Sequence, residues 1–128
     1  TLYPGPLVTD CEQYLKLRHL VDTGIVFVGH GLSSDFSVMN LVVPRAQIAD
    51  TLELWALDGQ RKVSLRYLFW FFFSEDVQAS QHDSVQDARA ALRLHDQYLM
   101  ERAAGTLDAT KERVYATGRK HGWKIGSR

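Results

Sequence analysis

The segment IVFVGHGLSSDF, residues 25–36, carries the clearest structural signal in this sequence. Its first four residues form a continuous run of β-branched and aromatic side chains, which predicts a strand buried on both faces. Gly29 and Gly31 then let the backbone turn sharply. Residues 32–41 are expected to form a short helix with Asp35 near its first turn. Because strands that are apolar on both faces are typical of parallel or mixed sheets, we expect Asp35 at the carboxyl edge of such a sheet.

Helix and strand signals continue on both sides of this segment. Before it, apolar residues recur at helical spacing from a cap at Thr9 or Asp10 to Thr23. After it, residues 48–51 are expected to form a short strand, and a strongly apolar helix is expected to begin behind a cap at Ser64. This alternation of helices and strands predicts an α/β domain.

The clearest helix start lies at Ser84, because Ser84 and Asp87 stand three positions apart in a variant of the capping box. One face of this helix is expected to pack on the sheet. Its residues are Ala88, Ala91, Leu92, His95, Tyr98 and Leu99. The aromatic run at residues 69–73 precedes this helix, and we interpret it as core packing or a partner-facing patch rather than a platform for stacking bases.

The composition narrows the classes of function. A chain of 128 residues fits one domain, and its 15 basic residues balance its 15 acidic ones. No global positive field therefore attracts nucleic acid, and any such binding must be local or mediated by a metal. The single cysteine, Cys11, favours a reducing compartment, and no apolar run approaches the length of a membrane span. We expect a soluble intracellular protein, and the start at Thr1 rather than Met indicates a fragment or a processed chain.

Positive charge gathers near the C-terminus. Residues 111–128 hold six lysines and arginines against one glutamate. We therefore expect a main unit at residues 1–105 and a basic tail at residues 106–128. The tail can contact RNA phosphates, with Trp123 stacking on a base, or it can simply be solvated.

Three side chains are candidates for chemistry. His82 lies just before the helix that begins at Ser84, and Asp87 lies in its first turn, so both can face one cleft. Near neutral pH a histidine can accept a proton from water, and an aspartate supplies hard oxygen ligands for magnesium or manganese. Asp35 adds a second carboxylate at a strand end, where open α/β sheets bind their ligands. The alternative for His82 and Asp87 is a helix cap beside a solvated histidine.

Two blocks of the sequence resemble the second and third motifs of the DEDDh class of exonucleases, which has a ribonuclease-H-like fold. The blocks are VGHGLSSDF at residues 28–36 and HDSVQDAR at residues 82–89. Within this class the connecting segments are similar to the catalytic subunits of poly(A)-nuclease deadenylase complexes. Those segments are NLVVP at 40–44, DT at 50–51 and SLRYL at 64–68.

This resemblance implies a magnesium- or manganese-dependent 3′–5′ exoribonuclease that shortens the poly(A) tails of messenger RNA and releases AMP by two-metal-ion hydrolysis. It places Asp35 and Asp87 at the metal-ligand positions of the class and His82 at the position of its general base. It implies as partners poly(A) RNA, a pseudokinase-like adaptor subunit and, indirectly, the poly(A)-binding protein, all in the cytoplasm or its P-bodies. Residues 1–105 are then the C-terminal part of a nuclease domain.

The first motif of the class, an Asp-x-Glu pair on an early strand, has no convincing counterpart. Asp10-Cys11-Glu12 spells the pattern, but it opens an amphipathic helix. We therefore expect the chain to begin past this motif and to lack the N-terminal strands of the fold. An open strand edge then favours self-association, and two carboxylates are too few to hold two cations firmly. The chain by itself is expected to degrade oligo(A) poorly or not at all.

Three alternatives to the deadenylase hypothesis differ in chemistry. The first is an RNA exonuclease of the same branch with another RNA substrate. The second is a non-catalytic nuclease remnant that binds RNA or protein through its aromatic patch and basic tail. The third, a metal-dependent phosphohydrolase built on a His82-Asp83 dyad, requires an all-helical fold, and the expected strand at residues 25–28 argues against it. For His30, in the glycine turn, a structural hydrogen bond is expected rather than a role in the site.

Overall fold

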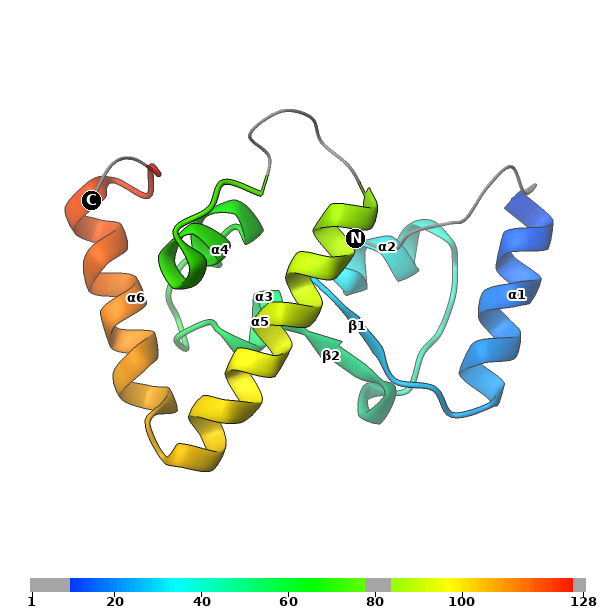
Figure 1. Cartoon of the computed structure of the whole chain (residues 1–128). Helices are drawn as coiled ribbons and strands as arrows, with labels where there is room; N and C mark the ends of the chain where they lie inside the picture. Colours follow the sequence, from blue (N-terminus) through cyan, green and yellow to red (C-terminus); the bar gives the residue numbers. More distant parts are fainter. Residues whose placement is uncertain (1–9, 78–83, 126–128) are drawn as a thin grey trace.

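The computed structural model describes residues 10–77 and 84–125, and of residues 10–14 and 84 it describes the backbone alone. The described segments form helices around a small sheet (Figure 1). In chain order the elements are α1 (Asp10–Asp22), β1 (Phe27–Gly29), α2 (Leu32–Val38), the 3-10 turn η1 (Arg45–Gln47), β2 (Ile48–Asp50), α3 (Thr51–Leu54), α4 (Leu65–Phe73), α5 (Ser84–Ala104) and α6 (Leu107–His121). No described helix is both long and apolar enough to cross a membrane.

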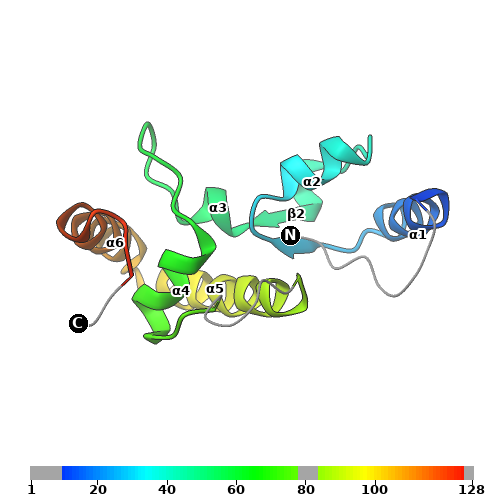
Figure 2. The same ribbon diagram turned by 90° about the horizontal axis from the view of Figure 1, so that it is seen from above.

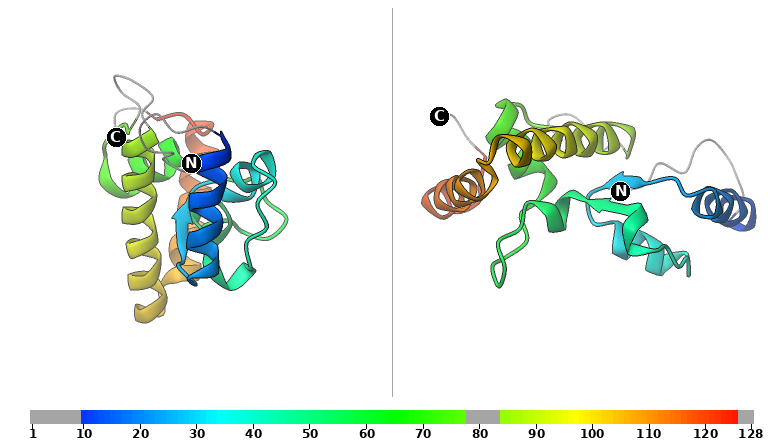
Figure 3. Two further views of the ribbon diagram at one scale, coloured as in Figure 1. Left: turned by 90° about the vertical axis from the view of Figure 1, so that its right-hand side faces the viewer. Right: turned by 90° about the horizontal axis from the view of Figure 1, so that it is seen from below.

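The sheet of the described chain has two parallel strands, β1 and β2. Phe27 pairs with Ile48 and Gly29 with Asp50, so both strands end at the same edge. Helix α5 crosses β1 in Figure 1, while α1 and α6 lie at opposite ends of the molecule (Figures 2 and 3). This arrangement confirms the predicted α/β class and parallel pairing.

The first strand begins later than the sequence predicts. Ile25 and Val26 are 44% and 52% exposed, so the expectation that residues 25–28 are buried on both faces is wrong for the first two. The backbone N–H of Ile25 still donates to Leu20 O at the end of α1, and its carbonyl accepts from the side-chain amide of Gln47 at 3.0 Å. Ile25 therefore belongs to the turn that ends α1.

Two apolar clusters form the core. The smaller one joins α1, β1 and α2 through Val21, Phe27, Leu32, Phe36 and Leu41. The larger one joins α4, α5 and α6 to the residues on either side of the loop between α3 and α4; its fully buried members include Trp55, Tyr67, Leu68, Leu94, Val114 and Tyr115. Helix α6 therefore contributes directly to the core, although the sequence presents residues 106–128 as a basic tail.

Helix α5 starts at Ser84 as predicted, but its buried stripe differs from the predicted one. The buried residues are Asp87, Ala90, Ala91 and Leu94. The predicted stripe of Ala88, Ala91, Leu92, His95, Tyr98 and Leu99 is displaced by one position, and Leu92 and Leu99 are exposed. The two stripes differ because the buried one includes the charged residue Asp87, and apolar periodicity does not identify a charged residue as buried.

Helix α4 confirms the expected cap and the interpretation of the aromatic run. The Ser64 hydroxyl accepts from the backbone N–H of Tyr67 at 3.2 Å, as an N-cap does. Phe69 and Trp70 are buried, and the three phenylalanines that follow pack against the same core. The run is mainly core packing.

The residues after α6 fold back onto the core. The Trp123 ring lies 5.4 Å from the rings of both Tyr67 and Tyr115. A methyl group on Gly118 would overlap this ring, so only glycine leaves room for it. The guanidinium of Arg61 covers the ring at 4.8 Å from its centroid. This packing favours a structural role for Trp123 over the stacking of a base.

The loop between α3 and α4 is held by a single hydroxyl group. The loop projects away from α5 (Figure 2). The buried Tyr115 hydroxyl accepts from the backbone N–H of Leu57 at 3.2 Å and donates to the carbonyl of Arg61 at 2.6 Å. One side chain of α6 therefore fixes both branches of the loop.

The 128-residue chain, expressed alone, is expected to self-associate or to be only marginally stable. Within the described residues β1 pairs with β2 alone, and exposed Ile25 and Val26 lead into its other edge. An unpaired apolar edge is a template for another chain. Sedimentation velocity at rising concentration measures this, and Val26→Lys, which places a charge on the exposed run, should reduce the association. A monomeric wild-type chain with a cooperative unfolding transition contradicts the expectation.

Candidate active site

Asp35 lies in the first turn of α2, directly after the turn that ends β1. Gly31 makes this turn possible with φ of +82°, a left-handed conformation that favours glycine. Asp35 is half-buried, and one of its carboxylate oxygens is fully buried. The structure therefore places this carboxylate at the carboxyl end of β1, where the sequence predicts it.

Asp87 lies in the first turn of α5 and is only 3% exposed. Aspartate is almost never buried to this degree unless its charge has partners. The buried Asp87 carboxylate is therefore held by the fold in the first turn of α5, and its role as a metal ligand stays a prediction.

His30 connects the region of Asp87 with the end of β1. Its ring lies close enough to Asp50 and Asp87 for both negative charges to act on it. Burial lowers the pKa of His30 below its usual value, and a hydrogen bond to Val63 and the charges of Asp50 and Asp87 oppose this shift only in part. The ring is therefore neutral at pH 7.

Both ring nitrogens of His30 have structural partners. Nε2 lies 3.0 Å from the carbonyl of Val63, which can only accept, so Nε2 carries the proton of the neutral ring. Nδ1 lies 2.8 Å from the hydroxyl of Thr51, which also lies 3.0 Å from the Gly29 carbonyl. The expectation of a structural hydrogen bond for His30 is confirmed.

Stability is expected to fall as the pH drops from 7 towards 5, in part because of His30. The folded protein binds a proton on this ring at a lower pH than the unfolded chain, whose histidine titrates near pH 6.5. The contribution of His30 is thus complete above that pH and is lost below it, by at most about 1.4 kcal/mol per pH unit. Urea unfolding at several pH values should show a shallower slope for His30→Gln than for the wild type. Equal slopes would contradict the assignment.

The candidate metal ligands are the two carboxylates, Asp35 and Asp87. Both offer hard oxygen atoms, the donor type that magnesium and manganese prefer. Among the side chains that the structure describes, at residues 15–77 and 85–125, no three from His, Cys, Asp or Glu come together as a metal site. The candidate general base, His82, lies outside the described residues. The backbone of Asp10-Cys11-Glu12 is helical, as expected, and the side chains of these residues lie outside the description.

Sequence reasoning missed the importance of Asp50 in this region. Its carboxylate accepts hydrogen bonds from the backbone of α2 as well as from that of its own helix, α3. An aspartate directly before a helix signals a cap, which could have predicted the contact with α3. The contact with α2 joins Asp50 to residues that lie 18 and 19 positions earlier in the chain. No local sequence pattern predicts a contact over that separation.

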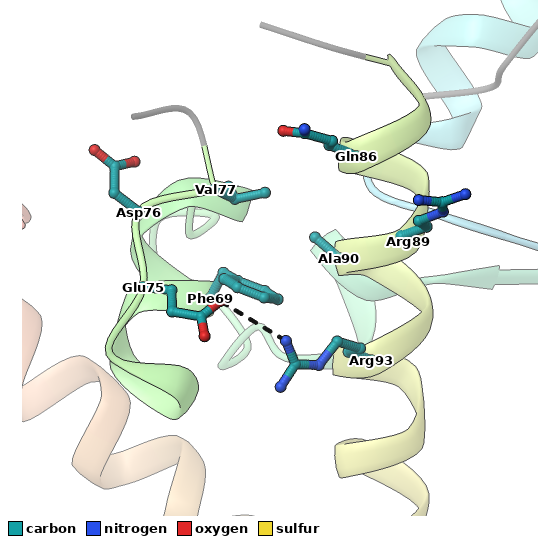
Figure 4. Close-up of a pocket in the computed structure, with 8 residues that line it drawn as sticks. All are labelled: Phe69, Glu75, Asp76, Val77, Gln86, Arg89, Ala90 and Arg93. Carbon is teal, nitrogen blue, oxygen red and sulfur yellow. Dashed lines mark ion pairs between the residues drawn. The ribbon is translucent and has the colours of Figure 1, made fainter. Parts of the chain in front are cut away.

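A cavity of about 350 Å³ lies between α4 and α5 (Figure 4). It is lined by Phe69, Glu75, Asp76, Val77, Gln86, Arg89, Ala90 and Arg93. Arg93 stacks over the ring of Phe73 at 4.0 Å and approaches Glu75 at 3.9 Å. Gln86 and Arg89 flank Asp87 in sequence, but neither Asp35 nor Asp87 lines this cavity.

Comparison with known proteins gives consistent matches. A family model described as Exonuclease matches residues 5–95. Catalytic subunits of the PAN2-PAN3 deadenylation complex from Homo sapiens and Schizosaccharomyces pombe are each 45% identical to this chain over 93% of its length. The chain covers only 10% and 12% of those two proteins.

Solved structures agree with these relatives. The Saccharomyces cerevisiae Pan2 pseudoubiquitin hydrolase-RNA exonuclease module in complex with A7 RNA matches with a TM-score of 0.89 at 40% identity, over 94% of this chain and 20% of that one. The Neurospora crassa Pan2 catalytic unit, with protease and nuclease domain, matches with a TM-score of 0.81 at 40% identity, over 94% of this chain and 19% of that one.

Proposed function

This chain belongs to the exonuclease family, and from that membership we propose that it serves in a poly(A)-specific 3′–5′ exoribonuclease, which shortens messenger RNA tails and releases AMP. The similarity to the nuclease structures confirms the predicted ribonuclease-H-like exonuclease fold. The relatives are catalytic subunits of a deadenylation complex. The Saccharomyces cerevisiae Pan2 module was solved in complex with A7 RNA.

The observation that carries the proposal is the burial of Asp87 in the first turn of α5. It supports the proposal because this chain is 45% identical to the deadenylase subunits named above. Asp87 is 3% exposed, and a charge is costly to bury unless it has partners. The charge of Asp87, on α5, acts on His30, which follows β1, and Asp35 lies in the first turn of α2 after the same strand. We propose that these two carboxylates serve one site.

We assign Asp35 and Asp87 as ligands of divalent metal, either magnesium or manganese, with two ions in a complete domain. Such ions activate water and stabilise the leaving oxygen of a phosphodiester. In this proposal His82 would accept the proton of the attacking water, and the two aspartates would hold the cations. Neutral His30 keeps its proton on Nε2 for the Val63 carbonyl and does not compete for that role.

The proposed partners follow from the relatives. Their name joins two proteins in one complex, so we propose that a second subunit, a pseudokinase-like adaptor, binds the protein that contains this chain. Poly(A) RNA is the proposed substrate, with the poly(A)-binding protein as an indirect partner. We place the protein in the cytoplasm.

The test compares two substrates with the full-length protein and magnesium. We expect faster AMP release from oligo(A) than from mixed-sequence RNA of equal length, and loss of release in EDTA. Equal rates on both RNAs would favour the alternative hypothesis of an RNA exonuclease of the same branch that acts on another RNA substrate. No release from either RNA, with retained RNA binding, would favour the non-catalytic remnant.

A further inference from the structure

The last residue of β2, Asp50, is only 6% exposed and pairs in register with Gly29, the last residue of β1. It therefore sits beside the turn that leads from β1 into α2. A buried carboxylate at this place needs hydrogen-bond donors, and the backbone supplies them.

Three backbone N–H groups donate to this carboxylate. Oδ1 accepts from Gly31 at 2.8 Å and from Leu52 at 3.0 Å, and Oδ2 accepts from Leu32 at 2.9 Å. Charge-assisted bonds of this length are stronger than those between neutral groups. Both oxygens are engaged by the backbone, so Asp50 acts as a structural acceptor.

Helix α2 depends on this contact because it has no cap of its own. Its N-cap residue is Gly31, which makes no side-chain capping bond. The first N–H groups of a helix need external acceptors, and Asp50 provides them from the neighbouring strand. Asp35 lies three residues after Leu32, in the turn that these bonds fix.

Thr51, the neighbour of Asp50, makes further contacts with the same turn. The Thr51 hydroxyl lies 2.8 Å from Nδ1 of His30 and 3.0 Å from the carbonyl of Gly29. Because neutral His30 carries its proton on Nε2, both of these groups are acceptors, and the single hydroxyl proton of Thr51 serves one of them at a time. Asp50 and Thr51, two consecutive residues of the β2–α3 junction, thus lie within hydrogen-bonding distance of four consecutive residues, 29–32.

We propose that Asp50 is a positioning residue for Asp35: it fixes the start of α2 and thereby the direction in which the Asp35 carboxylate meets a divalent metal. This inference rests on the proposed function. Residues that support metal ligands typically change metal affinity or activity by about 10- to 100-fold when they are replaced.

Asp50→Asn in the full-length protein tests the proposal. Asparagine keeps the shape but presents an N–H₂ group to one of the backbone donors, so at least one of the three bonds is lost. We expect kcat on oligo(A) to fall by about 10- to 100-fold and half-maximal activity to require more Mn²⁺, with KM for oligo(A) changed less than about twofold. High Mn²⁺ should restore part of the rate. Asp58→Asn, in the exposed loop before α4, is the matched control and should change none of these values.

Two measurements do not depend on turnover. Mn²⁺ binding followed by electron paramagnetic resonance should weaken in Asp50→Asn and not in Asp58→Asn. Hydrogen exchange in the wild-type protein should show protected amides at Gly31 and Leu32, which tests the contact even if the variant fails to fold. Wild-type kcat and Mn²⁺ binding in a folded Asp50→Asn protein, or rapid exchange of both amides, overturns the proposal. An inactive wild-type protein with protected amides and Mn²⁺ binding would instead count against the proposed function.

Discussion

Replacing Asp87 with Asn in the full-length protein is expected to lower AMP release from oligo(A) by roughly 1,000-fold or more, with the fold retained. Metal ions contribute several kcal/mol of transition-state stabilisation, and each 1.4 kcal/mol corresponds to a factor of ten in rate. Asparagine removes both the charge and one ligand oxygen of Asp87 while it keeps the volume of this buried side chain. Single-turnover release of AMP at saturating magnesium measures the effect.

The matched control is Asp96→Asn, which changes an exposed aspartate on the same helix. It should leave the rate within about twofold, since surface substitutions are usually nearly neutral. Circular dichroism of both variants establishes that α5 is intact. An Asp87→Asn protein that is folded and retains more than a tenth of the wild-type rate would show that this carboxylate is no metal ligand.

The largest effect on stability is expected from Trp55→Ala, at about 3–5 kcal/mol. Trp55 is fully buried, and its indole N–H donates to the carbonyl of Leu94 at 3.1 Å. Its ring lies 4.7 Å from that of Phe72 and 6.0 Å from that of Tyr98. The substitution therefore leaves a cavity and removes this hydrogen bond where the end of α3 meets α4 and α5.

A change of this size is a large part of the total stability of a domain. Calorimetry of the full-length protein should show a markedly lower melting temperature for the unit that contains this chain. Leu92→Ala is the control, because Leu92 is 49% exposed on the outer face of α5 and should change stability by no more than about 0.5 kcal/mol. Similar melting temperatures for the two variants would contradict the role given to Trp55.

Local signals in the sequence predict most elements of this fold. The N-cap at Ser64 and the helix start at Ser84 can be recognised in the sequence, because the residues that form such a signal lie within three or four positions of each other. The parallel sheet followed from two short apolar runs. The first strand begins two residues later than the apolar run predicts, because the carbonyl of Ile25 accepts from Gln47, 22 positions away, and no local pattern reports such a contact.

The candidate site was predictable in part. Asp35 and Asp87 lie where the sequence places them, just after a strand and in the first turn of a helix. Their roles as metal ligands, and that of His82 as a base, remain predictions. The support that Asp50 gives to α2 could not be predicted, because its donors depend on the register of two strands joined only in the folded state.

The Tyr115 hydroxyl gives α6 an influence beyond its own packing. Since it bonds both Leu57 and Arg61, the loop cannot open while α6 remains docked, and the two belong to one cooperative unfolding unit. The same loop leads to Val63, whose carbonyl holds His30 at the end of β1. Three hydrogen bonds thus connect α6, through this loop and His30, to Thr51 beside the turn that leads to Asp35.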